Sequence, residues 1–400
     1  MRPLLTLLIV LGQTGCLLAP PRPGSGDDKN CLPANATLGL SVAAALDDPD
    51  HDNLIRAAHT DNGWYLYFYP STAKTSLCPD RTFPLTGDGI VSVDAIEPAI
   101  VMGTTPDLLV LVSFANKGSA VIDVRSTDGA LSEAGRVVIN NYQPIPIDTP
   151  SGPRATGFVA LRANEQIWFG GGLQGFAVAS VTSGIRGTAE LVTVDASDGW
   201  YHAVPVRNPH DGNNFALIGA YGSYEARHSL SVINNTLVTE HDSECMAAPG
   251  CHDRRARNVS TSGPFDIAEA FSIDRTNGAL ETITSMATGA NGFDIEPHMT
   301  IDRGPGSVLD AASGELFGAD KTDVAMLWGS GTMRELITYE AMLKAPMVNS
   351  VSRFPFDAKL DRIAILRTDG LPHILLLSDD PHADPERCLQ VNGNTLKDCP

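Results

Sequence analysis

Five aspartates stand just before apolar runs that have the composition of β-strands. They are Asp52, Asp107, Asp266, Asp323 and Asp361, and each run begins within two residues of its aspartate. Carboxylates repeated in this way could ligate a hard cation, which prefers oxygen donors. They could instead accept hydrogen bonds from backbone N–H groups of the preceding loops. Which of the two roles these aspartates have depends on the structure of the segments that carry them.

The remaining reactive residue types form no familiar catalytic motif. The ten histidines include no pair at the four-residue spacing of a helical metal site, and neither HExxH nor GxSxG occurs. Residues 170–172 (GGG) follow a strand-like run but open no helix, unlike a phosphate-binding loop. The sequence therefore favours a non-catalytic protein, with an enzyme as the alternative.

Apolar runs come in pairs around glycine-containing turns, which is the pattern of β-hairpins. Seven pairs cover residues 54–69, 108–124, 166–181, 215–233, 266–284, 324–339 and 363–377. Helical periodicity is scarce, and its best candidate, residues 333–344, itself begins with strand-forming residues. The sequence predicts an all-β protein.

The hairpins recur at an average spacing of roughly 50 residues, a period typical of propellers and repeat arrays. Further strand-like runs, such as 135–141 and 190–194, leave room for four strands in each period. Strands that are apolar on both faces suit sheets packed between neighbouring sheets. We therefore predict a seven-bladed β-propeller with four-stranded antiparallel blades. A pair of β-sandwiches or a jelly roll with coincidental spacing is the alternative.

The junctions between aspartates and strands carry a resemblance to a known family. The segments DIAEAF, TDVAML and LDRIAILRTDGLPHILLL are similar to the FG-GAP/VCBS repeats of integrin-α-type propellers. The resemblance covers about residues 40–380 and implies the seven-bladed fold. It is specific only at these junctions.

The same resemblance implies a calcium site. Family loops bind Ca²⁺ through aspartates at alternate positions followed by a glycine and a final acid. Asp48, Asp50 and Asp52 match the alternating acids, but Asn53 replaces the glycine and Arg56 stands at the final acid position. Calcium at these three aspartates is thus a prediction. For the aspartates before the other strands, capping of loop N–H groups is the favoured role.

The N-terminus predicts export. Arg2 and the apolar stretch 4–11 have the form of a signal peptide and are too short to span a bilayer. Thr14 and Gly15 before Cys16 resemble a bacterial lipoprotein signal, although Gln13 stands where leucine is usual. Lipidation of Cys16, or conventional cleavage nearby, would follow. The predicted domains are a signal peptide (1–16), a Pro/Gly-rich tether (17–35), the propeller (36–382) and a C-terminal tail (383–400).

Export would leave six cysteines in an oxidising compartment. Candidate pairs are Cys31 with Cys78, Cys245 with Cys251, and Cys388 with Cys399, among the 15 connectivities that six cysteines allow. The last pair would staple the C-terminal tail. No pair has the CxxC spacing of a zinc or redox site.

The net charge of the chain limits the classes of partner that it could bind. Lys and Arg number 28 against 47 Asp and Glu, a net charge of −19, which disfavours nucleic acid and anionic membranes. We expect a binding or scaffold module at the bacterial outer membrane or cell surface, or alternatively in the periplasm or secreted. The lipid anchor would be its membrane contact, and its ligand a protein or carbohydrate held by propeller loops. A secreted glycan lyase or hydrolase is the alternative. Apart from calcium, no cofactor is expected.

Overall fold

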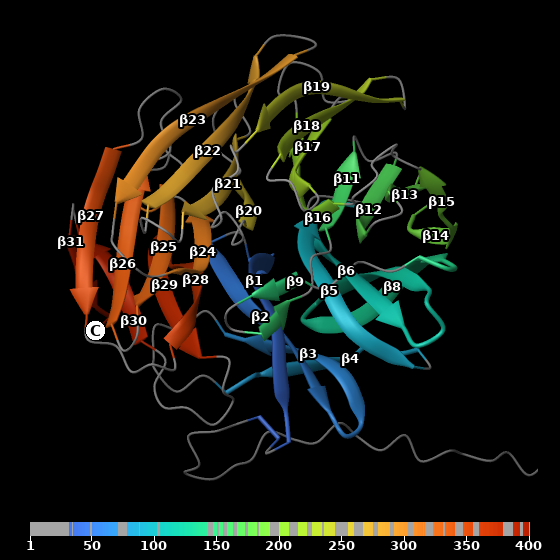
Figure 1. Ribbon diagram of the computed structural model, residues 1–400. Coiled ribbons are helices and arrows are strands. Elements are labelled where there is room, and N and C mark those ends of the chain that lie inside the picture. The colour runs from blue at the N-terminus through green and yellow to red at the C-terminus, as the bar shows by residue number, and fades with distance from the viewer. Residues whose placement is uncertain are drawn as a thin grey trace, which may run out of the picture.

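A computed structural model shows a chain built from antiparallel sheets that follow one another in sequence order (Figure 1). It describes residues 32–142, apart from gaps at 34, 49, 71–77, 88, 102–104, and from 147 to 399 it describes the strands named below with some of the turns between them. Every described element is a strand, and none of the described residues forms a helix that could cross a bilayer.

The first two sheets are described almost completely. The first contains β1 (Thr37–Asp48), β2 (His51–Thr60), β3 (Gly63–Tyr69) and β4 (Arg81–Pro84). The second contains β5 (Ile90–Ala99), β6 (Asp107–Phe114), β7 (Ser119–Thr127) and β8 (Ala130–Ile139). A fifth strand, β14 (Arg186–Thr188), pairs with β8 in parallel at the outer edge of the second sheet.

The later sheets repeat the four-stranded pattern. The third contains β11 (Phe158–Arg162), β12 (Gln166–Gly172), β13 (Gly175–Ser180) and β15 (Glu190–Val192), after a small hairpin of β9 (Ile147–Thr149) and β10 (Gly152–Arg154). The next contains β16 (Trp200–Arg207), β17 (Phe215–Tyr221), β18 (Ala226–Ile233) and β19 (Thr236–Glu244). It is followed by the sheet of β20 (Arg255–Val259), β21 (Ile267–Asp274), β22 (Ala279–Thr288) and β23 (Gly292–Asp302).

Two sheets complete the chain. One contains β24 (Ser307–Gly314), β25 (Asp323–Ser330), β26 (Met333–Glu340) and β27 (Met347–Phe354). The last contains β28 (Leu360–Thr368), β29 (Leu371–Ser378), β30 (Arg387–Asn392) and β31 (Thr395–Asp398). The segment with the best helical periodicity, 333–344, thus begins as strand β26, because its apolar side chains are buried on both faces of a sheet.

The first strands of successive sheets contact one another around a closed circuit. β1 contacts β5, β5 contacts β11, and the contacts continue through β16, β20, β24 and β28 back to β1. In Figure 1 the colours follow this circuit, so that the red last sheet lies beside the blue first sheet. A circuit of sheets joined along their first strands is the arrangement of a β-propeller.

Apolar packing between faces of neighbouring sheets explains the continuous apolar runs. In β6, Leu108 and Val110 pack towards the first sheet, while Leu109 and Leu111 pack towards the third. Because successive side chains of a strand point to opposite faces, a sheet with two packed faces needs apolar residues at every position. A separate apolar cluster joins the last sheet to the first.

The paired apolar runs do not occupy the same strands in every sheet. In the sheets before the last they form the second and third strands, as β2 and β3 do. In the last sheet they form β28 and β29, the first and second strands. Asp369 (φ 51°) and Gly370 (φ 71°) make the turn between these two strands. Positive φ at both positions is the geometry of a type I′ hairpin turn, which favours Asp-Gly.

Gly135 in β8 is required by a close approach of backbones. A Cβ atom at this position would overlap the main-chain carbonyl of Ile185, directly before β14. The glycine therefore lets β14 lie against the outer edge of the second sheet.

Candidate functional site

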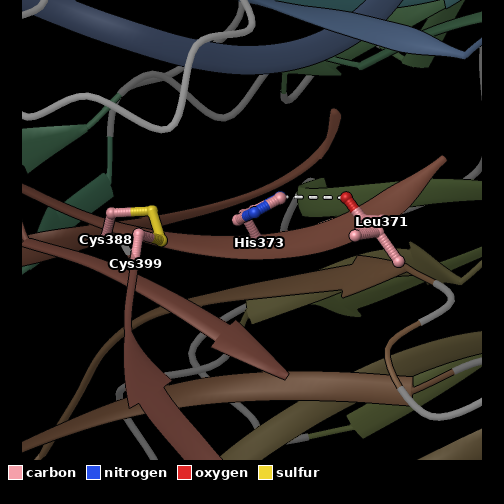
Figure 2. Close-up of a disulfide and its surroundings, with 4 residues drawn as sticks. All are labelled: Leu371, His373, Cys388 and Cys399. Carbon is pink, nitrogen blue, oxygen red and sulfur yellow. Dashed lines mark hydrogen bonds between the residues drawn. A yellow bond between two sulfur atoms is a disulfide. The ribbon is translucent and has the colours of Figure 1, made fainter. Parts of the chain in front are cut away.

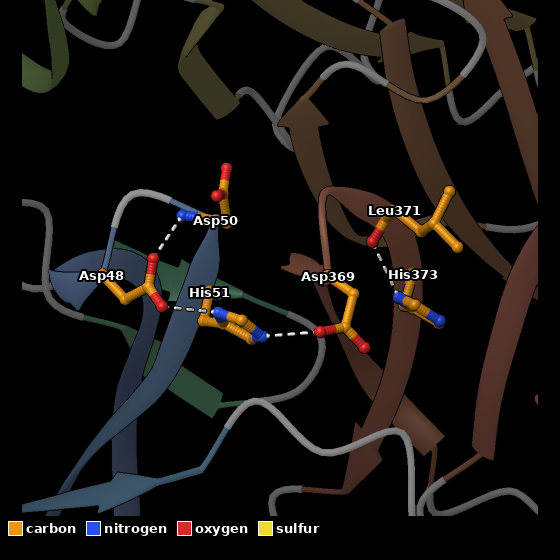
Figure 3. A network of polar contacts seen from close by, with 6 residues as sticks. All are labelled: Asp48, Asp50, His51, Asp369, Leu371 and His373. Atoms are coloured by element: carbon orange, nitrogen blue, oxygen red, sulfur yellow. Dashed lines mark hydrogen bonds and ion pairs between the residues drawn. The ribbon is translucent and has the colours of Figure 1, made fainter.

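Two turns from opposite ends of the chain meet where the circuit closes. Residues 48 and 50–52 lie at and beside the turn between β1 and β2, and residues 367–370 lie at and beside the turn between β28 and β29; we call their contact the seam (Figure 3). The backbone N–H of Gly370 donates to the carbonyl oxygen of Asp50 over 3.3 Å. The seam thus joins the first sheet directly to the last.

His51 is held between two carboxylates at the seam. Its Nδ1 lies 2.8 Å from Oδ2 of Asp48, and its Nε2 lies 3.0 Å from Oδ1 of Asp369. Hydrogen bonding to Asp48, and then to Asp369, raises the pKa of His51 above its ordinary value. The backbone N–H of Asp50, followed by His51, lowers the pKa of Asp48. The side chains of His51 and Asp369 are accessible to solvent.

Asp52 makes the second polar link across the seam. Its Oδ2 accepts the backbone N–H of Arg367 over 2.7 Å and lies 3.5 Å from Nε of the same arginine. β28 is the first strand of the last sheet and lies at its edge. The N–H groups of β28 that point away from β29 therefore have no strand partner within that sheet. The buried carboxylate of Asp52 satisfies one of them.

The predicted calcium ligands are close together in the sequence, but their carboxylates contact different residues. Asp48 turns to His51, and Asp52 turns to Arg367. Within the described ranges, no three His, Cys, Asp or Glu side chains gather in a way that could hold a metal ion. The binding of calcium at Asp48, Asp50 and Asp52 stays a prediction.

The aspartates before the other strands fall at different places. Asp107 is the first residue of β6 and Asp323 the first of β25, whereas Asp361 lies within β28. Asp266 lies outside the described residues. The carboxylate of Asp107 accepts hydrogen bonds from Nε and Nη2 of Arg125 over 2.9 and 2.6 Å. Capping of loop N–H groups by these aspartates stays a prediction.

Asp107 also belongs to a buried acid pair that the sequence analysis did not identify. Asp107 and Asp123 are each 1% exposed, and Nη2 of Arg125 lies 3.7 Å from Oδ2 of Asp123. Oδ1 of Asp123 is buried and makes no hydrogen bond with any described residue. Burial, and then the charge of Asp107, raises the pKa of Asp123 to about 7. The signal in the sequence was an aspartate inside the apolar run AVIDV, whose side chain must share a packed face.

A second buried acid, Asp94 of β5, is held by hydroxyl groups. Ser113 donates to it over 2.5 Å and Ser92 over 2.8 Å. Burial raises the pKa of Asp94 to about 6 although both hydrogen bonds lower it. Nearby, the hydroxyl of Ser119 donates to the carbonyl oxygen of Tyr142 over 2.7 Å. These contacts tie the strands of the second sheet together.

One predicted disulfide is present in the last sheet. Cys388 in β30 is bonded to Cys399, just beyond β31, and the N–H of Cys399 donates to the carbonyl oxygen of Cys388 (Figure 2). Cys388 is buried in the apolar cluster shared with the first sheet. On β29, His373 contacts the carbonyl oxygen of Leu371 through Nδ1, and burial lowers its pKa.

The other cysteines are described only in part. Cys78 is in a disulfide. Its predicted partner Cys31 lies outside the described residues, as do Cys245 and Cys251 and the predicted lipidation site Cys16.

Comparisons with known proteins identify the fold. No protein-family model and no curated protein matches the sequence. The structure of BBS1N in complex with ARL6DN superposes with a TM-score of 0.52 at 14% identity, covering 89% of this chain and 92% of that one. An arginine-to-alanine triple mutant of AofleA from Arthrobotrys oligospora has a TM-score of 0.45 at 10% identity, covering 80% and 88%. The BBS1 N-terminal domain is a β-propeller, and the described sheets have the arrangement of this fold.

Proposed function

We propose that this chain is an exported seven-bladed propeller, anchored by lipid at Cys16, that binds a protein or carbohydrate through its turns without catalysis. The observation that carries the proposal is the closed circuit of contacts between the first strands of successive sheets. A closed ring of packed sheets is a rigid scaffold, and loops on rigid scaffolds are the usual place for recognition.

The described buried acids favour binding over catalysis. Asp52, Asp94 and Asp107 accept hydrogen bonds from neighbouring strands, and Asp123 is enclosed between packed sheets. A general acid or base must come within hydrogen-bond distance of its substrate. Groups that are enclosed in this way serve the packing of the sheets.

Export is supported by the cysteines. Cys388 and Cys399 form a disulfide and Cys78 takes part in another. Disulfides persist in oxidising compartments such as the periplasm and the cell surface. A bacterial envelope protein with a lipidated Cys16 would meet that condition.

We further propose that the sheets derive from a common repeat. Asp52, Asp107 and Asp323 all stand at the beginning of the second strand of their sheets. This shared position supports degenerate repeats of the FG-GAP type. An experimental structure with a ring of more or fewer than seven sheets would contradict this assignment.

Lipidation is tested in the full chain expressed in a Gram-negative bacterium. We expect incorporation of labelled palmitate and recovery in the membrane fraction, both lost in Cys16→Ser. The matched control Cys245→Ser, which lies outside the signal, should keep both. Equal labelling of the Cys16 variant and the unaltered chain would refute the anchor.

Binding is tested by placing a photo-crosslinking amino acid at turns on opposite ends of the sheets. Asn62 and Asp128 are exposed turn residues suited to this purpose. We expect a discrete adduct from at least one turn in living cells, or saturable binding of the detergent-solubilised chain to an array of envelope glycans. Release of shortened or unsaturated glycans by the chain would instead show an enzyme. No adduct and no glycan binding would refute the binding module.

A further inference from the structure

The end of the first sheet opposite the seam carries two aromatic rings in contact. His59, near the end of β2, is exposed, and Trp64, its strand partner in β3, is half-buried. The centroids of the imidazole and indole rings are 5.3 Å apart, and the ring planes are tilted by 55°. Asp61 and Asn62, in the turn between the two strands, are exposed. Aromatic and polar side chains are thus brought together at one turn on the surface of the propeller.

The first strand of this sheet makes room for the indole of Trp64. A Cβ atom added at Gly39 of β1 would lie 3.2 Å from Cζ3 of Trp64, so the indole reaches from β3 across β2 to β1. A β-bulge interrupts the pairing of β1 with β2 between Leu38 and Ser41, beside this glycine. Bulges bend a strand locally and are over-represented next to functional sites.

The indole N–H of Trp64 lacks an acceptor. Nε1 is buried and has no hydrogen-bond partner among the described residues. A buried N–H without an acceptor is unfavourable, and buried tryptophans usually find one. His59 contacts the indole and is exposed, so its side chain can change rotamer without disturbing the packed core. Movement of this imidazole would give an acceptor from outside a route to the N–H.

The chemistry of this end of the sheet suits an uncharged saccharide. The C–H face of a sugar ring is apolar and can cover an indole face, while its hydroxyl oxygens can accept the indole N–H. The side chains of Asp61 and Asn62 offer acceptors and a donor for other hydroxyl groups. The net charge of −19 disfavours an anionic ligand. A quaternary ammonium group could also rest on the indole, but it offers the N–H no acceptor.

We propose that Trp64 and the adjacent turn form a binding site for one saccharide unit. The sugar ring displaces the imidazole of His59, stacks on the indole and accepts a hydrogen bond from Nε1. Asp61 and Asn62 contact its remaining hydroxyl groups. The site lies at the opposite end of the first sheet from the predicted calcium ligands. It rests on the proposed function, because it names the turn and the ligand class for a propeller that binds through its turns.

Nitrogen–proton NMR of the full chain tests the site with the methyl glycosides of glucose, galactose, mannose and N-acetylglucosamine. The chain contains four tryptophans, and the Trp64 indole signal is the one lost in Trp64→Phe. If that variant does not fold, His59→Ala identifies the signal, because it removes an exposed ring in contact with the indole. We expect at least one glycoside to shift this signal downfield and saturably, with a Kd of roughly 1 mM for one stacked ring with few hydrogen bonds.

The affinities of variants separate the roles of the two rings, and saturation transfer from the protein to the glycoside measures them. Trp64→Phe keeps an aromatic face but lacks the N–H, so its binding should be roughly two- to tenfold weaker. His59→Ala should bind roughly two- to tenfold more tightly, because the sugar no longer has to displace an aromatic contact. Tyr65→Phe is the matched control, since Tyr65 follows Trp64 in β3 but packs towards the last sheet. It should bind as the unaltered chain does.

Four results would overturn the saccharide site. They are no shift of the indole signal with any glycoside, a shift with tetramethylammonium alone, equal glycoside affinity in Trp64→Phe, and affinity in His59→Ala that is unchanged or lower. These results are distinct from failure of the proposed function. Glycoside binding that does not depend on Trp64, or a protein adduct at the turns, would still show a binding propeller.

Discussion

The buried Asp123 should make the protein less stable as pH rises, and Asp123→Asn should remove that loss. The pKa of Asp123 is raised from 3.8 to about 7 by burial and by the charge of Asp107. Between these values the folded state binds a proton that the unfolded state has released. The free energy of unfolding therefore falls as pH rises through this window and levels off above it.

The size of the effect follows from the shift. The difference between 3.8 and about 7 corresponds to an upper bound of about 4 kcal/mol. Relaxation of the two sheets and entry of water lower the cost of the ionised carboxylate, so we expect roughly 2 to 4 kcal/mol. The amide introduced by Asp123→Asn carries no charge and can donate to Asp107, so the variant should exceed the original by this amount at pH 8 and match it near pH 4.

Urea unfolding at a series of pH values from 4 to 8.5 measures the effect. Asp128→Asn is the matched control, because Asp128 lies in an exposed turn at φ 51°, a conformation that asparagine tolerates. Asp94 contributes its own pH dependence equally to all three proteins and cancels in the comparison. If Asp123→Asn leaves the slope with pH unchanged, or lowers the stability at pH 8, the reasoning is refuted.

Two further perturbations test the packing of the ring. Replacing both Cys388 and Cys399 by alanine should lower the free energy of unfolding by about 3 kcal/mol, the value for a short closed loop; urea unfolding measures this loss, and an unchanged free energy of unfolding would contradict it. Gly135→Ala should cost roughly 2 to 3 kcal/mol, because its methyl group displaces the backbone before β14. Exchange of the β14 amides should then rise, and unchanged protection there would show that the strand does not depend on this glycine.

The paired apolar runs could be read from the sequence because a hairpin is a local structure. Each pair needs only apolar runs and a glycine turn, and the pair at 363–377 is formed by β28 and β29 as expected. The position of each pair of strands within its sheet could not be predicted from the sequence. It depends on which neighbouring strands pair on either side, and short strands such as β4 carry little pattern of their own.

The contacts at the seam could not be predicted from the sequence. His51 and Asp369 are 318 residues apart, and they meet only because all the intervening sheets complete the circuit. The sequence did identify Asp48 and Asp52 as a distinctive acidic turn. The family resemblance implied calcium at this turn, which stays a prediction. The alternating acids carry no information about Arg367, which reaches Asp52 from the far end of the chain.

The strand β14 bears on how the chain emerges during synthesis. It lies in sequence between β13 and β15 of the third sheet, yet it pairs with β8 of the second. The outer edge of the second sheet therefore stays open until the ribosome has made residue 188, when most of the third sheet already exists. An uncovered edge is a template for pairing with another chain. β14 covers residues 136–138 of that edge, and the second sheet is therefore completed only together with the third.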